Sequence, residues 1–434
     1  MGWLGLLAFS AALALPASQP CGTFDGRGCA PPGARVDLAA PSFSNPTRIT
    51  NRLFPISRLR SVVLLGHVDG KPFRTETTLL PGTRTVTWNG RRIRVLVSQY
   101  MAYLDGRLDE VALDRYAQAD DGSVWYLGED VFDYRDGAVA ITEGTWLAGR
   151  EGPGAMIMPA APRVGDVYRT ENVPGIVFEE VTVTDTGRTV KGPLGPVRGA
   201  MVARELHLDR TTEDKLFAPG YGEFSTSGGG DLEALALAVP TDAAPGPQPP
   251  QLVTMTTGAE GVLESARLRD WEAVDATSRR VDAAWTSLRG GGPQPWRIAD
   301  RLAENLAALK RAVRGRRAAR VEQLALDVEQ SVLDLRLRYR PVAEIDAARF
   351  HLWTQQLRVD AAANDLAGVT GAVAVLEWIR DRVAQTLTPA GRTEVDGRLR
   401  ALRGASDARN VRAAADHAAR LSARLRELAP SPAA

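Results

Sequence analysis

The chain has 434 residues, enough for two ordinary domains, and its 53 basic and 52 acidic side chains leave a formal net charge of +1. A balance this even excludes the broad positive surface of nucleic-acid-binding proteins, so no nucleic-acid partner is expected. The halves differ slightly, because residues 1–250 carry 24 basic and 29 acidic side chains and the remainder carries 29 and 23. Opposite charge of this kind suggests that the two halves contact each other.

Residues 1–20 have the shape of a signal peptide. An apolar run from Trp3 to Leu15 is too short to cross a bilayer, and small residues and Pro follow it. The alternative, a buried N-terminal helix, is kept open because no Lys or Arg precedes the run. No later window suggests a transmembrane segment. We therefore expect a secreted or envelope-associated protein.

Two cysteines, Cys21 and Cys29, lie in an extended segment expected at 21–44. In an exported protein such a pair tends to form a disulfide. A lipid anchor on Cys21 is the alternative, although the preceding Ser-Gln-Pro is a poor match to lipidation sites. The sequence does not choose between the two.

Residues 45–239 are dominated by turn dipeptides that recur every 15 to 20 residues. Asp-Gly and Asn-Gly pairs accept the positive φ angles of two-residue hairpin turns. The pairs are Asp69-Gly70, Asn89-Gly90, Asp105-Gly106, Asp121-Gly122 and Asp136-Gly137.

Between and beyond these turns lie runs with strand-like alternation, which predict one antiparallel β-meander, either half-barrel or sandwich-like. The tract Gly228-Gly229-Gly230 is interpreted as a bend between strands. The expected strands are 61–68, 83–88, 93–101, 111–117, 124–127, 167–170, 176–184, 197–208 and 232–239.

Four stretches of this half carry a resemblance to a known group of proteins. They are ITNRLFPIS from Ile49, RYAQADDGSVWYLGED from Arg115, MIMPAAPRVGDVYR from Met156 and FAPGYGEF from Phe217. The region resembles the β domain of exported actinobacterial proteins that continue into a C-terminal helical bundle. The resemblance implies export and an all-β fold, and it implies no activity or catalytic residue.

A Pro-rich stretch at 240–252 predicts an extended linker without a packing surface. Beyond it, apolar residues recur at helical spacing through 253–428, ahead of a short tail at 429–434. The expected fold is therefore two-domain, all-β and then all-α, with seven or eight helices in an antiparallel bundle that folds on its own. Asp270, Asp365 and Asp407 each stand where a new helix begins and are predicted N-caps.

Aromatic and thioether side chains gather in the middle of the β half. On the inner face of a curved meander they could line a cavity for an apolar molecule or lipid, and the alternative is an ordinary core. The candidate ligand-binding residues are Tyr100, Tyr103, Tyr116, Trp125, Tyr126, Trp146, Met156 and Met158.

Two further candidates lie in the helical half. Glu344, Asp346 and His351 are close in sequence, and Glu344 and His351 share a helix face, as metal ligands would. The alternative is a solvated helix face. The basic run Lys310–Arg320 could bind an envelope protein or an anionic surface, or serve only as an exposed helix junction.

These observations favour an exported, non-enzymatic binding or envelope-associated protein that carries an apolar ligand or lipid in its β half. No cofactor is expected, because the usual metal and catalytic motifs are missing. A hydrolase or metal-dependent enzyme is the first alternative, with a site assembled around His67 or His207 from distant residues. A purely structural or protein-interaction module is the second.

Overall fold

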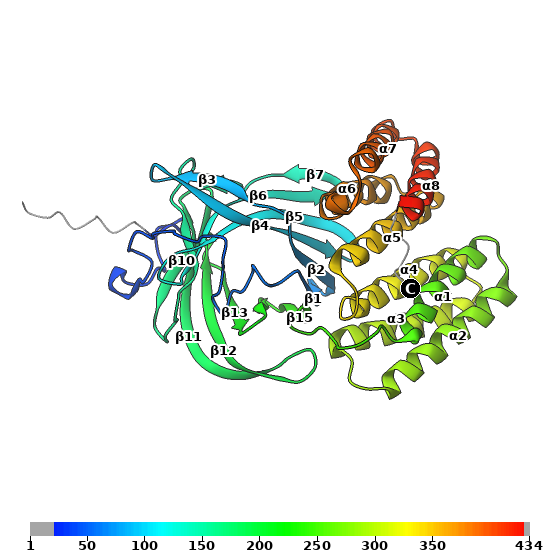
Figure 1. The fold of residues 1–434 in the computed structure, drawn as a ribbon, viewed down its shortest axis with the longest axis horizontal. Coiled ribbons are helices and arrows are strands. Elements are labelled where there is room, and N and C mark those ends of the chain that lie inside the picture. The colour runs from blue at the N-terminus through cyan, green and yellow to red at the C-terminus, as the bar shows by residue number, and fades with distance from the viewer. Residues whose placement is uncertain (1–20, 429–434) are drawn as a thin grey trace, which may run out of the picture.

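The structure, a computed structural model, describes residues 21–428. Within this range, fifteen strands form one open antiparallel sheet and eight helices form a bundle beside it (Figure 1). The predicted fold class, all-β followed by all-α, is confirmed. The predicted signal peptide and the C-terminal tail lie outside the described residues. No described helix is both long enough and apolar enough to cross a membrane.

The sheet is a meander whose two halves meet in the middle. Its order is β10 to β15, then β1, β2, β4, β5, β6 and β7, with β3 paired to β4 and with β8 and β9 paired to β6. The last strand thus pairs with the first. The strands are β1 Ser61–Val68, β2 Lys71–Leu79, β3 Arg84–Trp88, β4 Arg91–Leu104, β5 Arg107–Gln118, β6 Val124–Arg135, β7 Ala138–Ile141, β8 Trp146–Leu147, β9 Ala155–Met158, β10 Val167–Val173, β11 Val177–Lys191, β12 Pro196–His207, β13 Thr212–Ala218, β14 Gly222–Gly228 and β15 Asp231–Val239.

Four of the five predicted turn pairs have positive φ at both residues, and Asn89-Gly90 is typical with 51° and 71°. The prediction for Asp121-Gly122 is wrong, because φ is positive at Gly122 but not at Asp121 and the loop spans residues 119–123. The Asp121 carboxylate accepts hydrogen bonds from the Ser123 backbone N–H and hydroxyl, and this side-chain turn lengthens the loop.

The helices pack mainly as neighbours along the chain, and α4 is central, in contact with α1, α3 and α5. Asp270 and Asp365 cap α2 and α6, as predicted. Asp407 does not cap α8, since it is the last residue of α7, and Asn410 accepts the hydrogen bond from Ala413 N instead. The helices are α1 Pro250–Arg267, α2 Trp271–Gly290, α3 Trp296–Arg314, α4 Ala318–Arg336, α5 Val342–Ala362, α6 Leu366–Val383, α7 Pro389–Asp407 and α8 Val411–Leu428.

The Pro-rich connection is shorter and better anchored than expected. α1 already begins at Pro250, where the fixed φ of Pro suits the first helical turn. The connection is also held against the end of α4, because Ala244 N donates to the Arg338 carbonyl and Arg338 Nε donates to the Asp242 carbonyl. The predicted linker without packing is therefore replaced by a hydrogen-bonded segment.

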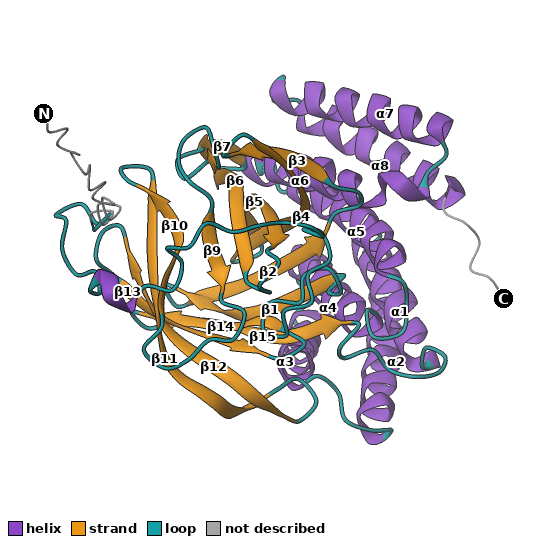
Figure 2. Cartoon of the chain, turned by 60° about the vertical axis from the view of Figure 1, so that its left-hand side comes forward, coloured by secondary structure: helices purple, strands orange, loops and turns teal. Residues whose placement is uncertain are grey.

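One apolar cluster contains side chains from both halves, which corrects the expectation of a separate helical core. Its strand members include Val63 and Leu65 of β1 and Met101 of β4, and its helix members come from all eight described helices. Because side chains alternate across a strand, these residues share the face of the sheet that the helices cover (Figure 2). Successive side chains of each strand point to opposite faces, and those on this face bury apolar surface against the bundle.

A buried ion network crosses the same interface. Arg382 Nη1 lies 2.6 Å from Glu76 Oε2, and Arg349 Nη2 lies 2.8 Å from Asp334 Oδ1. Arg74 joins the two acids, with guanidinium nitrogens 2.6 Å from Glu76 and 2.8 Å from Asp334. The network links β2 with α4, α5 and α6, and so fixes the bundle on the sheet.

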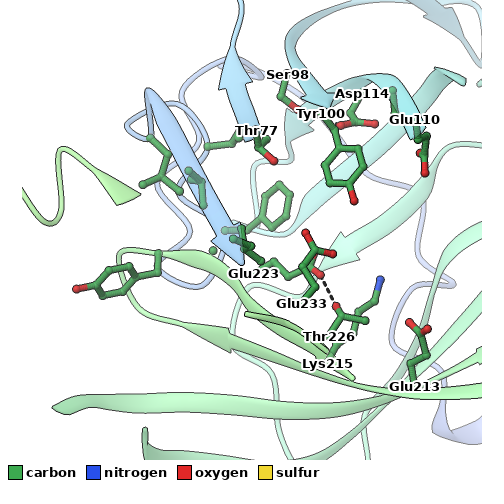
Figure 3. A pocket seen from close by; sticks show the side chains of 18 of the residues that line it. Thr77, Ser98, Tyr100, Glu110, Asp114, Glu213, Lys215, Glu223, Thr226 and Glu233 are labelled. Atoms are coloured by element: carbon green, nitrogen blue, oxygen red, sulfur yellow. Dashed lines mark hydrogen bonds between the residues drawn. The ribbon is translucent and has the colours of Figure 1, made fainter. Parts of the chain in front are cut away.

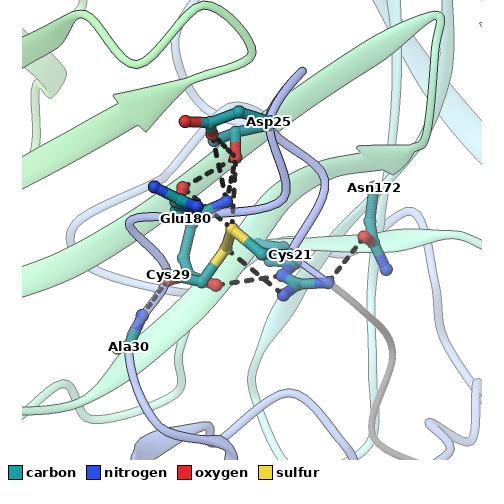
Figure 4. Close-up of a disulfide and its surroundings, with 9 residues drawn as sticks. Cys21, Asp25, Cys29, Ala30, Asn172 and Glu180 are labelled. Atoms are coloured by element: carbon teal, nitrogen blue, oxygen red, sulfur yellow. Dashed lines mark hydrogen bonds and ion pairs between the residues drawn. A yellow bond between two sulfur atoms is a disulfide. The ribbon is translucent and has the colours of Figure 1, made fainter.

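The N-terminal segment lies against the end of the sheet that is farthest from the helices (Figure 1), and Figure 4 shows its disulfide and polar contacts. A disulfide joins Cys21 and Cys29, so the expected pairing is present and Cys21 is not available for a thioether anchor. Ala30 N donates to Glu180 Oε1 at 2.7 Å, and Glu180 also holds the buried Arg169 at 3.0 Å. This arrangement anchors the segment on β10 and β11.

Candidate functional site

The face of the sheet that points away from the helices encloses a cavity of about 530 Å³. Side chains of β4 and β5, among them Tyr100 and Asp114, point across it toward Lys215 and Glu233 of β13 and β15 (Figure 3). Much of the wall is apolar, as a site for a hydrocarbon group requires. The apolar lining includes Phe54, Ile56, Leu59, Val62, Leu64 and Phe73.

The cavity is strongly acidic. Seven carboxylate residues line it, against a single Lys and no Arg or His. Strand alternation explains part of this excess, because Glu110 and Asp114 are spaced so that both point to the same face of β5. The seven are Glu110, Asp114, Glu129, Glu213, Glu223, Asp231 and Glu233.

Three of these carboxyl groups titrate near neutral pH. Burial raises the pKa of Glu110 to about 8, and the negative charges of neighbouring acids add to the effect. Burial and Glu129 raise the pKa of Asp114 to about 7, although the hydroxyls of Tyr126 and Ser98 donate hydrogen bonds to it. Burial and the adjacent Glu223 likewise raise the pKa of Glu233 to about 7.

Beside the cavity, β11, β12 and β13 bring one cluster of charged side chains together. Among the described residues, Glu179, Glu205 and His207 form the one group of three whose potential ligand atoms lie within 4.8 Å of one another. Lys215 Nζ lies 2.7 Å from Glu205 Oε2, so an ammonium already occupies one side of this group. We therefore interpret the cluster as an internally ion-paired group that lies beside the cavity.

Electrostatics supports this interpretation. Burial opposes a charged imidazole, but the carboxylates of Glu179 and Glu213, 3.5 Å and 3.6 Å from the ring nitrogens, outweigh it and raise the His207 pKa to about 10. Burial also opposes a charged Glu179, and Lys215 and His207 reverse this, so the Glu179 pKa falls to about 2. Burial and the nearby Glu179 raise the pKa of Glu205 to about 7, although Lys215 and His207 act in the opposite direction, so the carboxyls of the cluster differ widely in pKa.

The eight predicted ligand-binding residues separate into distinct positions. Tyr100 and Tyr116 line the cavity, whereas Tyr103 lies on the opposite face of the sheet, stacked on Trp353 with ring centroids 5.5 Å apart. Tyr126 donates to Asp114 at 2.7 Å and so orients a cavity carboxylate. The other four, Trp125, Trp146, Met156 and Met158, pack inside the apolar core of the β half.

One of these core residues still has a polar role. Trp146 Nε1 donates to Glu171 Oε1 at 3.2 Å, and Glu171 is hydrogen-bonded in turn to the cavity residue Glu129. Burial and the neighbouring carboxyls of Glu179 and Glu129 raise the pKa of Glu171 well above its ordinary value. The prediction that Trp146 contacts a ligand is thus replaced by a supporting role.

The predicted metal ligands do not converge. Glu344 pairs with Arg340 at 2.7 Å, whereas Asp346 is buried in the interface network beside Arg349. His351 Nδ1 lies 2.7 Å from Ser422 Oγ on α8. Glu344 and His351 share a helix face, but seven residues separate them by about 10 Å along the axis, so each side chain has its own partner.

Sequence reasoning missed the acidic lining, although a signal for it existed. Glu205 and His207 on β12, and Glu213 and Lys215 on β13, occupy alternate positions and so share one face, and the register places Glu205 opposite Glu213. Such alternation of charged residues marks a polar inner face. No protein-family model matches this chain, and no curated protein matches it.

Proposed function

We propose that this protein is an exported binding protein whose β half holds a small cationic molecule with an apolar part. The observation that carries the proposal is the cavity of about 530 Å³ with seven carboxylates, one Lys and an apolar wall. A volume of this size suits a small ligand. A buried, like-charged set of carboxylates is unfavourable by itself, and a bound cation relieves the repulsion.

The acidic lining changes the ligand expected from the sequence. Aromatic side chains alone favoured a neutral apolar molecule or a lipid. However, a neutral ligand offers no positive charge to Glu110, Asp114 and Glu233, whereas a cation would stabilise their ionised forms. An amine attached to a hydrocarbon group satisfies both kinds of wall. Carriage of such an amphiphile replaces carriage of a neutral lipid as the favoured hypothesis.

Isothermal titration calorimetry with four probes that differ in charge and chain length tests the proposal, at concentrations at which no micelles form. Dodecylamine, dodecanol and dodecanoate share a chain and differ in head group, while spermidine carries charge without a long chain. We expect dodecylamine to bind at least about tenfold more tightly than the other two dodecyl compounds, a difference of about 1.4 kcal/mol. Equal affinity for the three would exclude recognition of the charge.

A matched pair of variants locates the binding. Glu233→Gln keeps the acceptor for the Thr75 hydroxyl, which donates to Glu233 at 2.5 Å, and removes only the charge. Its dodecylamine affinity should fall about tenfold, as expected for loss of one partly buried charge partner. Glu272→Gln, on the exposed surface of α2, is the control and should bind as the parent does.

Binding should strengthen as pH rises. A cation lowers the pKa of the carboxyls that face it, so binding releases protons from Glu110, Asp114 and Glu233, whose pKa values are about 8, 7 and 7. Dodecylamine affinity should therefore increase between pH 5.5 and pH 8, by up to about tenfold per pH unit for each proton released. Calorimetry in buffers of different ionisation enthalpy measures that proton number directly.

Metal analysis and the four binding measurements also distinguish the two alternative functions, an enzyme and a structural module. Stoichiometric metal in protein purified from its native envelope would favour an enzyme at Glu179, Glu205 and His207. Protein that contains no metal and binds none of the four probes would favour a structural or protein-interaction role. Either result would displace the binding-protein proposal.

A further inference from the structure

A second cavity, of about 650 Å³, lies where the sheet meets α3, α4 and α5. It shares no lining residue with the acidic cavity. Leu65, Arg74 and Tyr103 contribute from the sheet, on the face that the helices cover, and Ile298 and Trp353 contribute from the bundle. The site is therefore formed only when the two halves are together.

Its lining is rich in hydrogen-bonding groups without net charge. The amides of Asn305, Gln323, Gln330 and Gln356 and the hydroxyl of Ser331 all reach it. Asn305 donates its amide N–H groups to the Asp327 carbonyl and the Ser331 hydroxyl, and Gln330 donates to Asp334. Within residues 21–428 no group donates to their side-chain oxygens, so these oxygens can accept from ligand hydroxyls.

Two of the four carboxylates that line this cavity have close protein partners. Asp334 holds Arg74 and Arg349 at 2.8 Å each, and Asp327 accepts from Gln323 Nε2 at 3.0 Å. Glu304 lies at the exposed edge, 4.0 Å from Arg301. Asp105 also lines the cavity and is exposed, so the other two carboxylates lie at the solvent-exposed edge.

Positive charge gathers on one side of the entrance. Arg311, at the end of α3, and Arg320, in the first turn of α4, both line the cavity and are exposed. They belong to the basic run found in the sequence, and no acidic residue lies between Glu304 and Glu322. Lys310 of that run is paired with Asp282 at 2.5 Å, so the arginines, not this lysine, face the entrance.

We propose that this interface cavity binds an anionic, hydroxyl-rich ligand, namely a sugar that carries a phosphate or carboxylate group. Asn305, Gln330 and Ser331 would contact hydroxyls, because amide and hydroxyl groups pair with them in both directions. Arg311 and Arg320 would hold the acidic group, since guanidinium binds phosphate and carboxylate through paired N–H donors. The ligand could be a free sugar acid or phosphate, or the same head group on a lipid.

Calorimetry with glucose 6-phosphate, glucuronate, glucose and inorganic phosphate tests the chemistry. Glucose 6-phosphate and glucuronate should bind at least about tenfold more tightly than either glucose or inorganic phosphate, because only they use both parts of the site. Flotation with phosphatidylcholine vesicles, with and without phosphatidylinositol, distinguishes a lipid head group from a soluble ligand. Retention only with phosphatidylinositol assigns the site to the lipid source.

Three variants locate the binding. R311S/R320S should reduce glucose 6-phosphate affinity to the level of glucose. A308F fills the cavity while the charges remain, and it should remove binding of the sugar phosphate but leave any weak attraction to phosphate. R400S/R412S removes two exposed arginines from α7 and α8 and is the matched control, expected to bind normally.

Thermal unfolding of each variant shows whether it is folded before its binding is interpreted. Inorganic phosphate that binds as tightly as glucose 6-phosphate would overturn the proposal, because the arginines alone would then explain binding. Unchanged binding in a folded A308F variant would also overturn it. Because the two cavities share no residue, loss of dodecylamine binding and loss of sugar-phosphate binding are separate outcomes.

Discussion

Gly66 on β1 sets how closely two strands can approach in the middle of the sheet. A Cβ atom at this position would lie 1.6 Å from the backbone oxygen of Leu232 on β15. Backbone cannot move aside as a side chain can, so Gly66→Ala should separate β1 from β15. We expect a loss of about 2 kcal/mol or more in the free energy of unfolding, measured by urea denaturation.

Gly404 is the matched control, because a Cβ there meets no atom within 4 Å. It lies within α7, where Ala is a better helix former than Gly. Gly404→Ala should therefore raise the free energy of unfolding by about 0.5–1 kcal/mol. Two substitutions of the same kind should thus have opposite signs, and a loss at both sites would contradict the steric argument.

At the scale of elements, the sequence predicted the ends of strands and helices well where a turn or cap depends only on nearby backbone groups. The Asp-Gly and Asn-Gly hairpins and the caps at Asp270 and Asp365 are of this kind. By contrast, β7, β8 and β9 were missed because they have only four, two and four residues, and β2, β13 and β14 were missed because their sequences are mostly polar. The latter three strands carry polar side chains toward the buried ion network or the acidic cavity, so their alternation is not one of apolar against polar.

The correction at the start of α8 makes a specific prediction. Asn410→Ala removes the acceptor of the Ala413 N–H and should cost about 1 kcal/mol in the free energy of unfolding. Asp407→Ala should change it by little, because a carboxylate in the last turn of α7 gains nothing from that helix dipole. Chemical denaturation followed by circular dichroism measures both. A larger loss of stability in Asp407→Ala than in Asn410→Ala would instead support Asp407 as the N-cap of α8.

For the whole molecule, the buried ion network joins the two halves beside the apolar cluster that they share. Arg349 is fully buried, and its removal leaves Glu76, Asp334 and Asp346 short of one cation. Arg349→Met should lower the free energy of unfolding by about 3–5 kcal/mol, as for other broken buried pairs. Arg279→Met, which breaks an exposed pair with Asp275, should cost at most about 1 kcal/mol.

The two sets of buried carboxyls predict how stability depends on pH. Burial alone would raise the Glu76 pKa, but Arg349, Arg74 and Arg382 hold it well below its usual range. Its contribution is therefore present above the unfolded pKa of about 4 and is lost as pH falls below that value. Glu110 and Glu233, with pKa values of about 8 and 7, act in the opposite sense and reduce stability as pH rises above about 4.

Stability should therefore be greatest at mildly acidic pH and fall on both sides. Urea unfolding between pH 3 and pH 9 measures this dependence. Saturating dodecylamine should remove the fall above pH 6, because a bound cation lets the cavity carboxyls ionise without repulsion. The acid side should be unchanged, since Glu76 lies on the other face of the sheet, in the interface network. A steady rise in stability up to pH 9 without ligand would contradict the assignment.

By itself, the sequence determined the order of an all-β and an all-α half, most hairpin turns and most helix caps. These features depend on backbone preferences and hydrogen bonds within a few residues. Only the tertiary structure decided the sign of charge in the cavity and the union of the halves. The acidic lining draws on strands from β5 to β15, and the network joins Glu76 to Arg382, about three hundred residues apart. Such contacts depend on strand register and on how the bundle docks, and no local pattern encodes either.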